Sequence, residues 1–393
     1  MLTKKNNFIY FNINRCCQCG ACLSICNSGA LSVNIDNKGL HHIILDEEKC
    51  TQCLKCIRVC PAHILPNMPV PTLGEALGVW LVHARDENTR NAASSGGAGR
   101  LLFKTAIEGG VVDTGYALKS KEGYPWAEGR FWKELIDVSL MPNSIYHPVL
   151  ALRNFDEKPE CTSLVVIGCP CQLAAVQLLV GKKTRLIKIA IYCKQQKHLG
   201  FAEYVAKSIG QKFCMHENIT PVRWRGDGWP GTVSMGGVKL IHEEIAAVPF
   251  GRHLWRVPGC KNCANPYGND VDITLSDPWG IESRGLGKTL VVVWTKVGAE
   301  LLEQASDELS VKGIPVETAV KAFNKSDEKL KAVLAKSRAC DTRSPIGVRL
   351  AGWVEDCQVR ALEYLLGRVV LPKIVLKVIA HLPDFRRIAM WLS

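Results

Sequence analysis

The amino-acid sequence lacks the long apolar run that a membrane-spanning helix needs. Among its 393 residues there is no uninterrupted stretch of about 18 apolar residues, and the most apolar stretch, 369–382, is broken by Pro372, Lys373 and Lys377. The first residues lack the apolar core of a secretory signal peptide. Charged residues make up 22% of the chain, which fits neither a disordered tail nor a coiled coil. We therefore expect a globular, cytoplasmic protein.

Aromatic residues are also scarce, at 7% of the chain, and they do not alternate with basic residues in the stripe that marks nucleic-acid-binding surfaces. The formal net charge is nevertheless +12, from 49 basic and 37 acidic residues. This excess of base suits an acidic partner, a phosphate-bearing ligand or an anionic membrane surface. Nucleic acid is not among the partners that we expect.

The sequence divides into three regions. Residues 1–66 hold nine of the 18 cysteines, and a proline-rich linker with Pro66, Pro69 and Pro71 follows the last of them. Residues 67–312 alternate short apolar runs with helical ones, which predicts an α/β domain whose sheet is covered by helices. After about residue 313 no further strand is predicted, and three segments of residues 313–393 have helical spacing. The expected fold class is α/β (α+β for the whole chain), with a small head, a central α/β domain and a helical tail.

Periodicity predicts the elements of the two larger regions. Strands are expected at 78–84, 111–112, 163–167, 185–192, 271–276 and 289–295. Helices are expected at 95–108, 173–180, 201–209, 316–336, 348–366 and 372–382.

Dense cysteine in a protein that is not exported indicates metal binding, because cytosolic thiols stay reduced. Two runs share the spacing Cys-x2-Cys-x2-Cys-x3-Cys of two-cluster bacterial ferredoxins, in which the fourth cysteine of each run ligates the other cluster. The predicted ligands of one 4Fe–4S cluster are Cys16, Cys19, Cys22 and Cys60, and those of the second are Cys50, Cys53, Cys56 and Cys26. A pair of zinc sites is the alternative, but zinc sites combine separated cysteine pairs. Cys17 is a spare thiol, unless the ligand register is shifted by one.

The cysteine-rich region is basic, with seven Lys/Arg against four Asp/Glu. Complementary charge speeds the encounter with an acidic electron donor, so a reduced ferredoxin or flavodoxin is a candidate partner. A solvated basic surface without a partner is an equal alternative.

Six motifs follow in a characteristic order: Ala93-Ser-Ser-Gly-Gly, Pro142-Asn-Ser-Ile-Tyr, Ile167-Gly-Cys-Pro-Cys-Gln, Cys193, Trp255-Arg-x3-Cys260-x2-Cys263 and Val271-Asp-Ile-x2-Ser-Asp-Pro-Trp-Gly. This series resembles the coenzyme F-420 hydrogenase/dehydrogenase beta-subunit family, to which 7-hydroxymethyl chlorophyll a reductase belongs. The resemblance extends from Cys16 to about Leu302. It implies FAD, iron–sulfur clusters and two-electron reduction or oxidation of a small organic molecule.

The resemblance also assigns a flavin site. The segment Ser94, Ser95, Gly96 and Gly97 precedes a predicted helix, where hydroxyls and backbone N–H groups can hold a phosphate, and the resemblance assigns it to the FAD pyrophosphate. A helix cap is the alternative. The other expected flavin contacts are Ser144, Tyr146, Asp277 and, where a strand ends and a helix begins, Gly168, Pro170 and Gln172. Tyr146 fits a core position equally well, and Asp277 fits a turn.

Four further cysteines, Cys171, Cys193, Cys260 and Cys263, are implied by the resemblance to bind a third 4Fe–4S cluster close to the flavin. Structural zinc or unpaired buried thiols are the alternatives. Cys169 is able to substitute for Cys171, although the Pro-Cys-Gln motif of the family favours Cys171.

The chemistry of their side chains suggests three candidate substrate-binding residues. His198 is a candidate proton donor for a flavin hydride step, with a capping or surface histidine as the alternative. Lys194 lies in the segment after Cys193, whose residues differ from those found there in the deazaflavin-using members of the family. Arg225 lies in a segment of cations and indoles that suits a planar or anionic ligand.

Two oxidoreductase hypotheses result. In the first, an external low-potential donor reduces the clusters, which pass electrons to FAD and on to a small organic substrate. In the second, the chain oxidises reduced coenzyme F-420 and feeds a larger complex. The basic C-terminal helices fit either packing on the domain or on a second subunit, as in a homo-oligomer, or contact with an anionic membrane surface.

Overall fold

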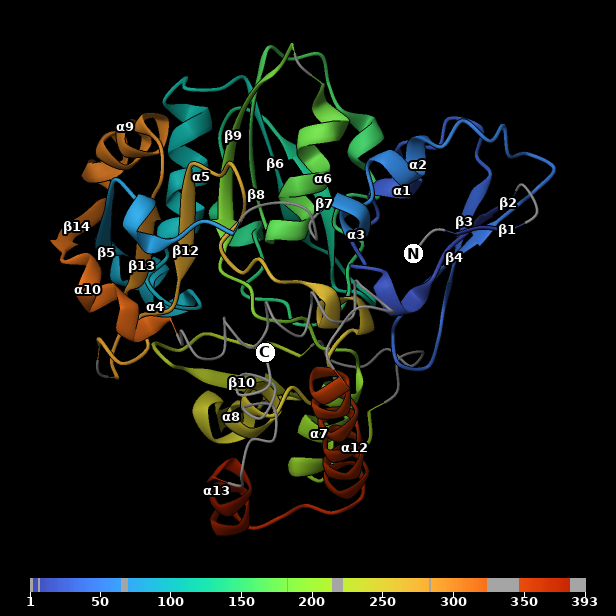
Figure 1. Cartoon of the computed structure of the whole chain (residues 1–393). Helices are drawn as coiled ribbons and strands as arrows, with labels where there is room; N and C mark the ends of the chain where they lie inside the picture. Colours follow the sequence, from blue (N-terminus) through green and yellow to red (C-terminus); the bar gives the residue numbers. More distant parts are fainter. Residues whose placement is uncertain are drawn as a thin grey trace.

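The structure, a computed structural model, describes residues 3–5, 8–64, 70–181, 183–213, 222–282, 284–323 and 346–381. No helix within these ranges is long and apolar enough to cross a membrane. Figure 1 shows a small N-terminal head (blue), a central sheet with helices on both faces, and a third layer that ends in the C-terminal helices (red).

A mixed sheet of eight strands forms the centre, in the order β14-β5-β13-β12-β9-β8-β6-β7. The strands are β5 (Gly78–Ala84), β6 (Thr114–Ser120), β7 (Ala127–Trp132), β8 (Ser163–Gly168), β9 (Arg185–Ile191), β12 (Ile273–Ser276), β13 (Thr289–Val293) and β14 (Leu309–Ile314). The neighbours β12, β9, β8 and β6 run parallel, and the outer strands pair antiparallel. β8 and β13 are rich in Val, Leu and Ile, as expected for strands buried on both faces.

Helices cover both faces of this sheet. α5 (Ala98–Glu108) and α9 (Lys296–Gln304) pack on one face, where Phe103 is fully buried. α6 (Pro170–Val180) connects the parallel strands β8 and β9 and packs on the other face, where Leu173 is buried. The short helices α4 (Glu87–Ala92) and α10 (Val316–Ala319) flank the sheet.

The described residues of the head form two short hairpins, three short α-helices and the 3-10 helix η1 (Ile13–Arg15). The hairpins and α-helices are β1 (Thr3–Lys5) with β2 (Phe8–Tyr10), β3 (Leu31–Ile35) with β4 (His41–Leu45), α1 (Ala21–Ser24), α2 (Lys55–Arg58) and α3 (Pro61–Ile64). The two cysteine runs share a backbone conformation, because Gln18 and Gly20 in the first run and Gln52 and Leu54 in the second all have positive φ. The repeat in the sequence is therefore also a repeat of loop structure.

The head packs against the face of the sheet that α6 covers. Cys19 and Ala21 share a hydrophobic core with Leu173 of α6, and Figure 1 shows α1, α2 and α3 beside that helix. The Leu152 N–H donates to the Cys19 carbonyl over 2.7 Å. Buried apolar surface and a paired backbone group thus fix the head on the central domain.

A third layer has its own core. It contains α7 (Gly200–Ser208), β10 (Thr232–Met235), β11 (Val238–Ile241), α8 (His242–Gly251), α12 (Ile346–Arg368) and α13 (Lys373–His381). Phe201 stacks on Trp224 with ring centroids 4.9 Å apart. Leu366 of α12 and Ile379 of α13 are buried in the same core, which attaches the C-terminal helices to the third layer.

The predicted α/β fold class is confirmed, and most predicted elements are present with ends that differ by a few residues. The predicted strand at 111–112 is wrong: the Val112 N–H donates to the Ala106 carbonyl and closes the end of α5, and the strand begins at Thr114. β7 and β14 are absent from the sequence prediction, because charged residues and glycine interrupt their apolar pattern. The predicted helix at 316–336 begins with α10, and residues 324–336 lie outside the described residues.

The short 3-10 helix η6 (Pro258–Asn262) lies directly against the head. A Cβ atom on Gly259 would overlap the Cys16 carbonyl. The Asn262 side-chain amide donates to the Asn14 carbonyl over 2.9 Å. Glycine is required at this position because two backbone segments approach each other more closely than any side chain permits.

We expect Gly259→Ala to lower the free energy of unfolding by about 1–3 kcal/mol, because backbone on both sides of the contact must shift. Gly251→Ala is the matched control, since an added Cβ there meets no atom within 4 Å. Thermal denaturation compares the two variants. Equal melting temperatures would contradict the close packing of η6 on the head.

Candidate functional site

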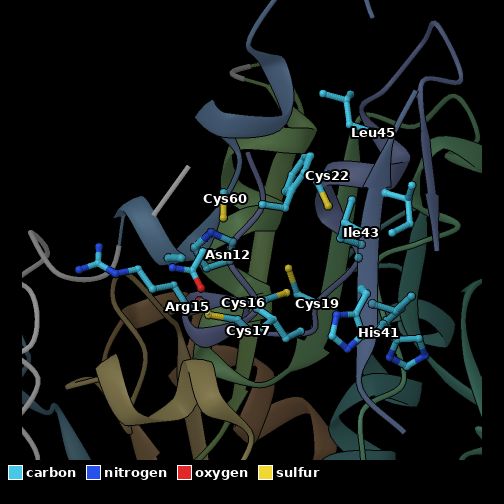
Figure 2. A pocket seen from close by; sticks show the side chains of 18 of the residues that line it. Asn12, Arg15, Cys16, Cys17, Cys19, Cys22, His41, Ile43, Leu45 and Cys60 are labelled. Carbon is cyan, nitrogen blue, oxygen red and sulfur yellow. Dashed lines mark hydrogen bonds between the residues drawn. The ribbon is translucent and has the colours of Figure 1, made fainter. Parts of the chain in front are cut away.

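Four thiols of the head surround one cavity. Cys16, Cys19, Cys22 and Cys60 line a cavity of about 400 Å³, together with Cys17. Figure 2 shows the sulfur atoms of these four residues directed toward a common space. Cys60 belongs to the second cysteine run, so the first group takes its fourth thiol from the other run.

A second group of thiols forms around α2. Cys26, Cys53 and Cys50 are the thiol neighbours of Cys56, and Cys26 comes from the first run. Burial raises the pKa of Cys56, and likewise that of Cys16 in the first group, to about 11. Such thiols stay protonated near neutral pH unless a cationic metal centre stabilises the thiolate.

Both groups offer four cysteine sulfurs, the donor set of a 4Fe–4S cluster. In the described part of the chain, no three Cys, His, Asp or Glu side chains converge closely enough to hold a single metal ion. The four thiols of each group are the donor set that fits a cluster in each half of the head.

A third group of cysteines lies in the central domain. Cys169 is within hydrogen-bonding reach of Cys193, and Cys171 and Cys260 are further neighbours. Cys171, at the start of α6, is itself within hydrogen-bonding reach of Cys17 of the head. The structure thus brings Cys193 and Cys260 together and presents two thiols, not one, at the start of α6.

The loop that carries Cys260 and Cys263 joins this third group to the head. Gly259 abuts the Cys16 carbonyl on one side. On the other side, the Cys193 N–H donates to the Pro266 carbonyl over 3.0 Å, which ties the end of β9 to the same loop. The third group therefore lies directly behind the first group of head thiols.

Predicted flavin residues from three segments meet near the start of α5, together with Arg225, a predicted substrate residue. The Ser144 N–H and hydroxyl both donate to the Ser94 hydroxyl, over 2.9 and 3.0 Å. Arg225 Nη2 donates to the Ser94 carbonyl over 2.6 Å, and Nη1 pairs with Asp277 over 2.8 Å. The Tyr146 hydroxyl accepts from Arg225 Nη1 over 3.5 Å. The fold thus assembles a single polar site from residues far apart in the sequence.

Arg225 is the charged centre of this site, with only 2% of its surface exposed. Burial alone would lower the pKa of Arg225, but Asp277 and Tyr146 outweigh it and raise the pKa above its ordinary value. Burial also raises the pKa of Tyr146. The site therefore combines a permanent cation with a protonated phenol.

Ser95, Gly96 and Gly97 shape the start of α5. The Ser95 hydroxyl lies 3.1 Å from the Thr289 hydroxyl of β13, and the Gly96 N–H donates to that hydroxyl over 3.1 Å. Gly97 has a φ of +84° immediately before the helix. Since the Gly96 N–H is already bonded, a phosphate here would be bound by Ser94 and the first N–H groups of α5, which have no partner within the helix.

Three buried nitrogen atoms in this neighbourhood have no hydrogen-bond partner among the described residues: Arg225 Nε, Trp229 Nε1 and His242 Nδ1. His242 Nε2 lies 3.3 Å from the Tyr146 hydroxyl. Trp229 lies against Trp279, with ring centroids 4.9 Å apart. Buried polar atoms are normally paired, so these residues fit a site that a polar, planar ligand such as a flavin completes. Sequence reasoning missed His242, which lies outside every motif.

One segment connects the third cysteine group to the Arg225 site. The Gln196 N–H lies 3.4 Å from the Cys260 sulfur, and the adjacent Lys197 N–H donates to the Tyr146 carbonyl over 2.7 Å. The Lys197 side chain is completely buried, and its ammonium group donates to two backbone carbonyls at 2.7 Å each. The segment after Cys193 therefore contacts Cys260 on one side and Tyr146 on the other.

Three other predicted flavin residues, Gly168, Pro170 and Gln172, lie at the junction of β8 and α6, beside the third cysteine group. The Gln172 side chain caps α6 by accepting from the Cys169 N–H over 2.8 Å. The structure therefore separates the predicted flavin contacts into two places, one at Arg225 and one at the start of α6.

The predicted substrate residues also lie in different places. Arg225 lies in the polar site, but His198 lies at the boundary with the head, where its Nδ1 accepts from the Gly200 N–H over 3.1 Å. Burial lowers the pKa of His198 to about 4, so its ring is neutral near neutral pH. Lys194 is half-buried in the loop after Cys193.

Substitution of Arg225 tests the polar site. We expect Arg225→Gln to be purified with less than about a tenth of the wild-type flavin, because the site loses its permanent cation and leaves Asp277 unpaired. Arg223→Gln is the matched control, since Arg223 is two residues away, 39% exposed and paired with Asp227 at 3.2 Å. The measurement is flavin absorbance per protein after heat release, with circular dichroism to confirm folding. Equal flavin in both folded variants would contradict the assignment.

Two kinds of known protein family match parts of the chain. Residues 161–318 match the family described as the C terminus of the coenzyme F420 hydrogenase/dehydrogenase beta subunit. Residues 15–64 and 42–101 each match a 4Fe-4S dicluster domain. No curated protein matches the chain.

Among solved structures, a chain of the F420-reducing NiFe hydrogenase complex from Methanosarcina barkeri is similar to this one. The two chains are 16% identical with a TM-score of 0.50, over 67% of this chain and 94% of that chain. This likeness shows a shared fold. The family matches, taken without this likeness, show that residues 161–318 are a domain of the coenzyme F420 hydrogenase/dehydrogenase beta-subunit family and that the N-terminal region is a 4Fe-4S dicluster domain, so the chain is an iron–sulfur oxidoreductase of this type.

Proposed function

We propose that the protein passes electrons from a low-potential donor through three 4Fe–4S clusters to FAD and on to a small organic substrate. The observation that carries this proposal is a continuous series of contacts. It leads from Cys16 to the loop of Gly259 and Cys260, and from there through the segment after Cys193 to Tyr146. Each candidate cofactor site thus lies next to the following one.

The second group of head thiols is the proposed point at which electrons arrive. Cys53 is exposed, and Lys55 and Arg58 of α2 are exposed beside it. Cations around an exposed thiol suit an acidic donor such as a reduced ferredoxin or flavodoxin. The first group lies between this surface and the third group.

The clusters, when bound, supply one-electron carriers. Four cysteines of the first head group would hold one cluster and four of the second group another. Cys193, Cys260 and Cys263 would hold the third, with Cys171 as the fourth ligand that the resemblance implies. Cys169, which lies nearer to Cys193, is the alternative fourth ligand.

FAD, when bound, supplies the conversion between one-electron and two-electron chemistry. The chain would bind it with the Ser94 hydroxyl, the first N–H groups of α5 and the Arg225 cation, which Asp277 orients. For the proton of the substrate step, Tyr146 is better placed than His198. The Tyr146 hydroxyl lies between Arg225 and His242, whereas one His198 nitrogen is already bonded at the head boundary.

Oxidation of reduced coenzyme F-420 is the second candidate function. It is favoured by the fold shared with a chain of an F420-reducing hydrogenase complex. In that role the chain would pass electrons to a further subunit and would not turn over an organic acceptor by itself. The compounds that reoxidise the reduced chain under anaerobic conditions distinguish the two functions.

The central step of the first proposal is tested by Cys263→Ala. Loss of one thiolate destabilises a cubane cluster, so electron transfer to the flavin should slow by at least about two orders of magnitude. The head should still accept electrons, because its ligands lie elsewhere. Stopped-flow absorbance after mixing with a reduced donor follows both steps, and the exposed Cys357 on α12 provides the control variant Cys357→Ala.

Flavin reduction at the wild-type rate in Cys263→Ala would mean that the third group is structural. If Cys263→Ala slows flavin reduction as expected, the pair Cys169→Ser and Cys171→Ser identifies the fourth ligand, since only one of the two should reproduce the effect of Cys263→Ala.

A further inference from the structure

The outer side of α12 and α13 exposes large apolar side chains. The exposed set is Trp353, Tyr364, Leu365, Val369, Val370, Ile374, Val375 and Val378. Trp353 and Tyr364 are each 61% exposed, and helical spacing places them on one face of α12. Ile374 and Val378 are 72% and 60% exposed and share one face of α13. A concentration of this kind marks an interaction surface.

The acidic side chains of α12 are bound within the protein. Residues 346–381 contain only three acidic residues, Glu355, Asp356 and Glu363. All three bind the segment 252–261: Glu355 pairs with an arginine at 3.4 Å, Asp356 pairs with a lysine at 2.6 Å, and Glu363 accepts a backbone N–H. The inner side of α12 therefore uses all of its negative charge within the protein.

Basic side chains lie on the outer side with the apolar ones. Arg360, Arg368 and Lys377 are exposed. The Arg368 guanidinium lies over the Tyr364 ring, 4.1 Å from its centroid. The outer side of α12 and α13 thus combines cations, aromatic rings and aliphatic side chains, and the three acidic residues of α12 are bound by the segment 252–261.

This combination decides between two kinds of partner. A second copy of the chain that used the same patch would bring the cations of both copies together, because a two-fold interface pairs a patch with itself. An anionic phospholipid surface offers a favourable contact to each kind of side chain in the patch. Its headgroups pair with Arg and Lys, Trp and Tyr reside at headgroup level, and aliphatic side chains enter the acyl boundary.

We propose that α12 and α13 form a docking surface for an anionic membrane, to which the protein binds peripherally. This role is separate from the redox function proposed above. In Figure 1 the two helices lie apart from the head, so membrane binding leaves the exposed Cys53 open to an electron donor.

Sedimentation of the full chain with vesicles tests the proposal. Binding to phosphatidylcholine vesicles that contain phosphatidylglycerol should be at least about tenfold stronger than binding to pure phosphatidylcholine, and it should weaken with added salt. The double variant Ile374→Glu/Val378→Glu should lose most binding to both vesicles. Arg360→Glu/Arg368→Glu should lose the preference for anionic vesicles.

Two exposed positions elsewhere serve as controls. Leu135→Glu replaces a leucine that is 90% exposed, and Lys312→Glu reverses a charge on the edge strand β14. Both should bind like the wild type, and all variants should keep the wild-type far-ultraviolet spectrum because every altered side chain is exposed.

Absence of vesicle binding, equal binding to neutral and anionic vesicles, or binding that the α13 variant leaves unchanged would each overturn the proposal. A dimer in light scattering that Ile374→Glu/Val378→Glu dissociates would overturn it as well, because a second copy would then cover the surface.

Discussion

The backbone contact between Gly259 and Cys16 is the constraint on which the rest of the structure depends. Electrons move between centres only over short distances, so a thiol group of the head and one of the central domain have to lie close together. A side chain at position 259 would separate them, and glycine removes that obstacle. The positive-φ loops of the cysteine runs and the hydrophobic core shared with α6 hold the head in the position that this contact requires.

The loop that carries Cys260 is held from two sides. The head contacts it through Gly259 and Asn262, and α12 contacts it through Glu355 and Asp356. Behind it, the buried segment of Lys197 leads to the Arg225 site. The C-terminal helices therefore have two proposed roles. Their inner side stabilises the candidate third cluster site, and their outer side forms the proposed membrane surface. A single helix can have both roles because its three acidic residues bind the segment 252–261, whereas Arg360 and Arg368 are exposed.

The parts of the site that depend on local spacing could be predicted from the sequence. Ligands within one cysteine run lie a few residues apart, so their spacing alone indicated the two head groups, and apolar runs indicated the central strands. The other features of the site depend on long-range packing, which the spacing of residues in the sequence does not specify. His242 reaches the Tyr146 hydroxyl only through the fold, and which of two thiols at the start of α6 faces Cys193 depends on side-chain direction within one helical turn. Gly168 and Gln172 belong to a motif at the start of α6, where Cys169 and Cys171 also lie, so spacing in the sequence did not specify which cofactor site the motif serves.

Electron paramagnetic resonance of the dithionite-reduced, anaerobically purified protein, together with its iron content, tests the central claim most directly. Three adjacent clusters predict about 12 iron atoms per chain. They also predict a third-cluster signal that is broadened by magnetic coupling to the head, because the Cys260 loop touches the Cys16 loop. About eight iron atoms per chain, or a third signal free of such broadening, would contradict the claim that the head and the central domain form one continuous electron path.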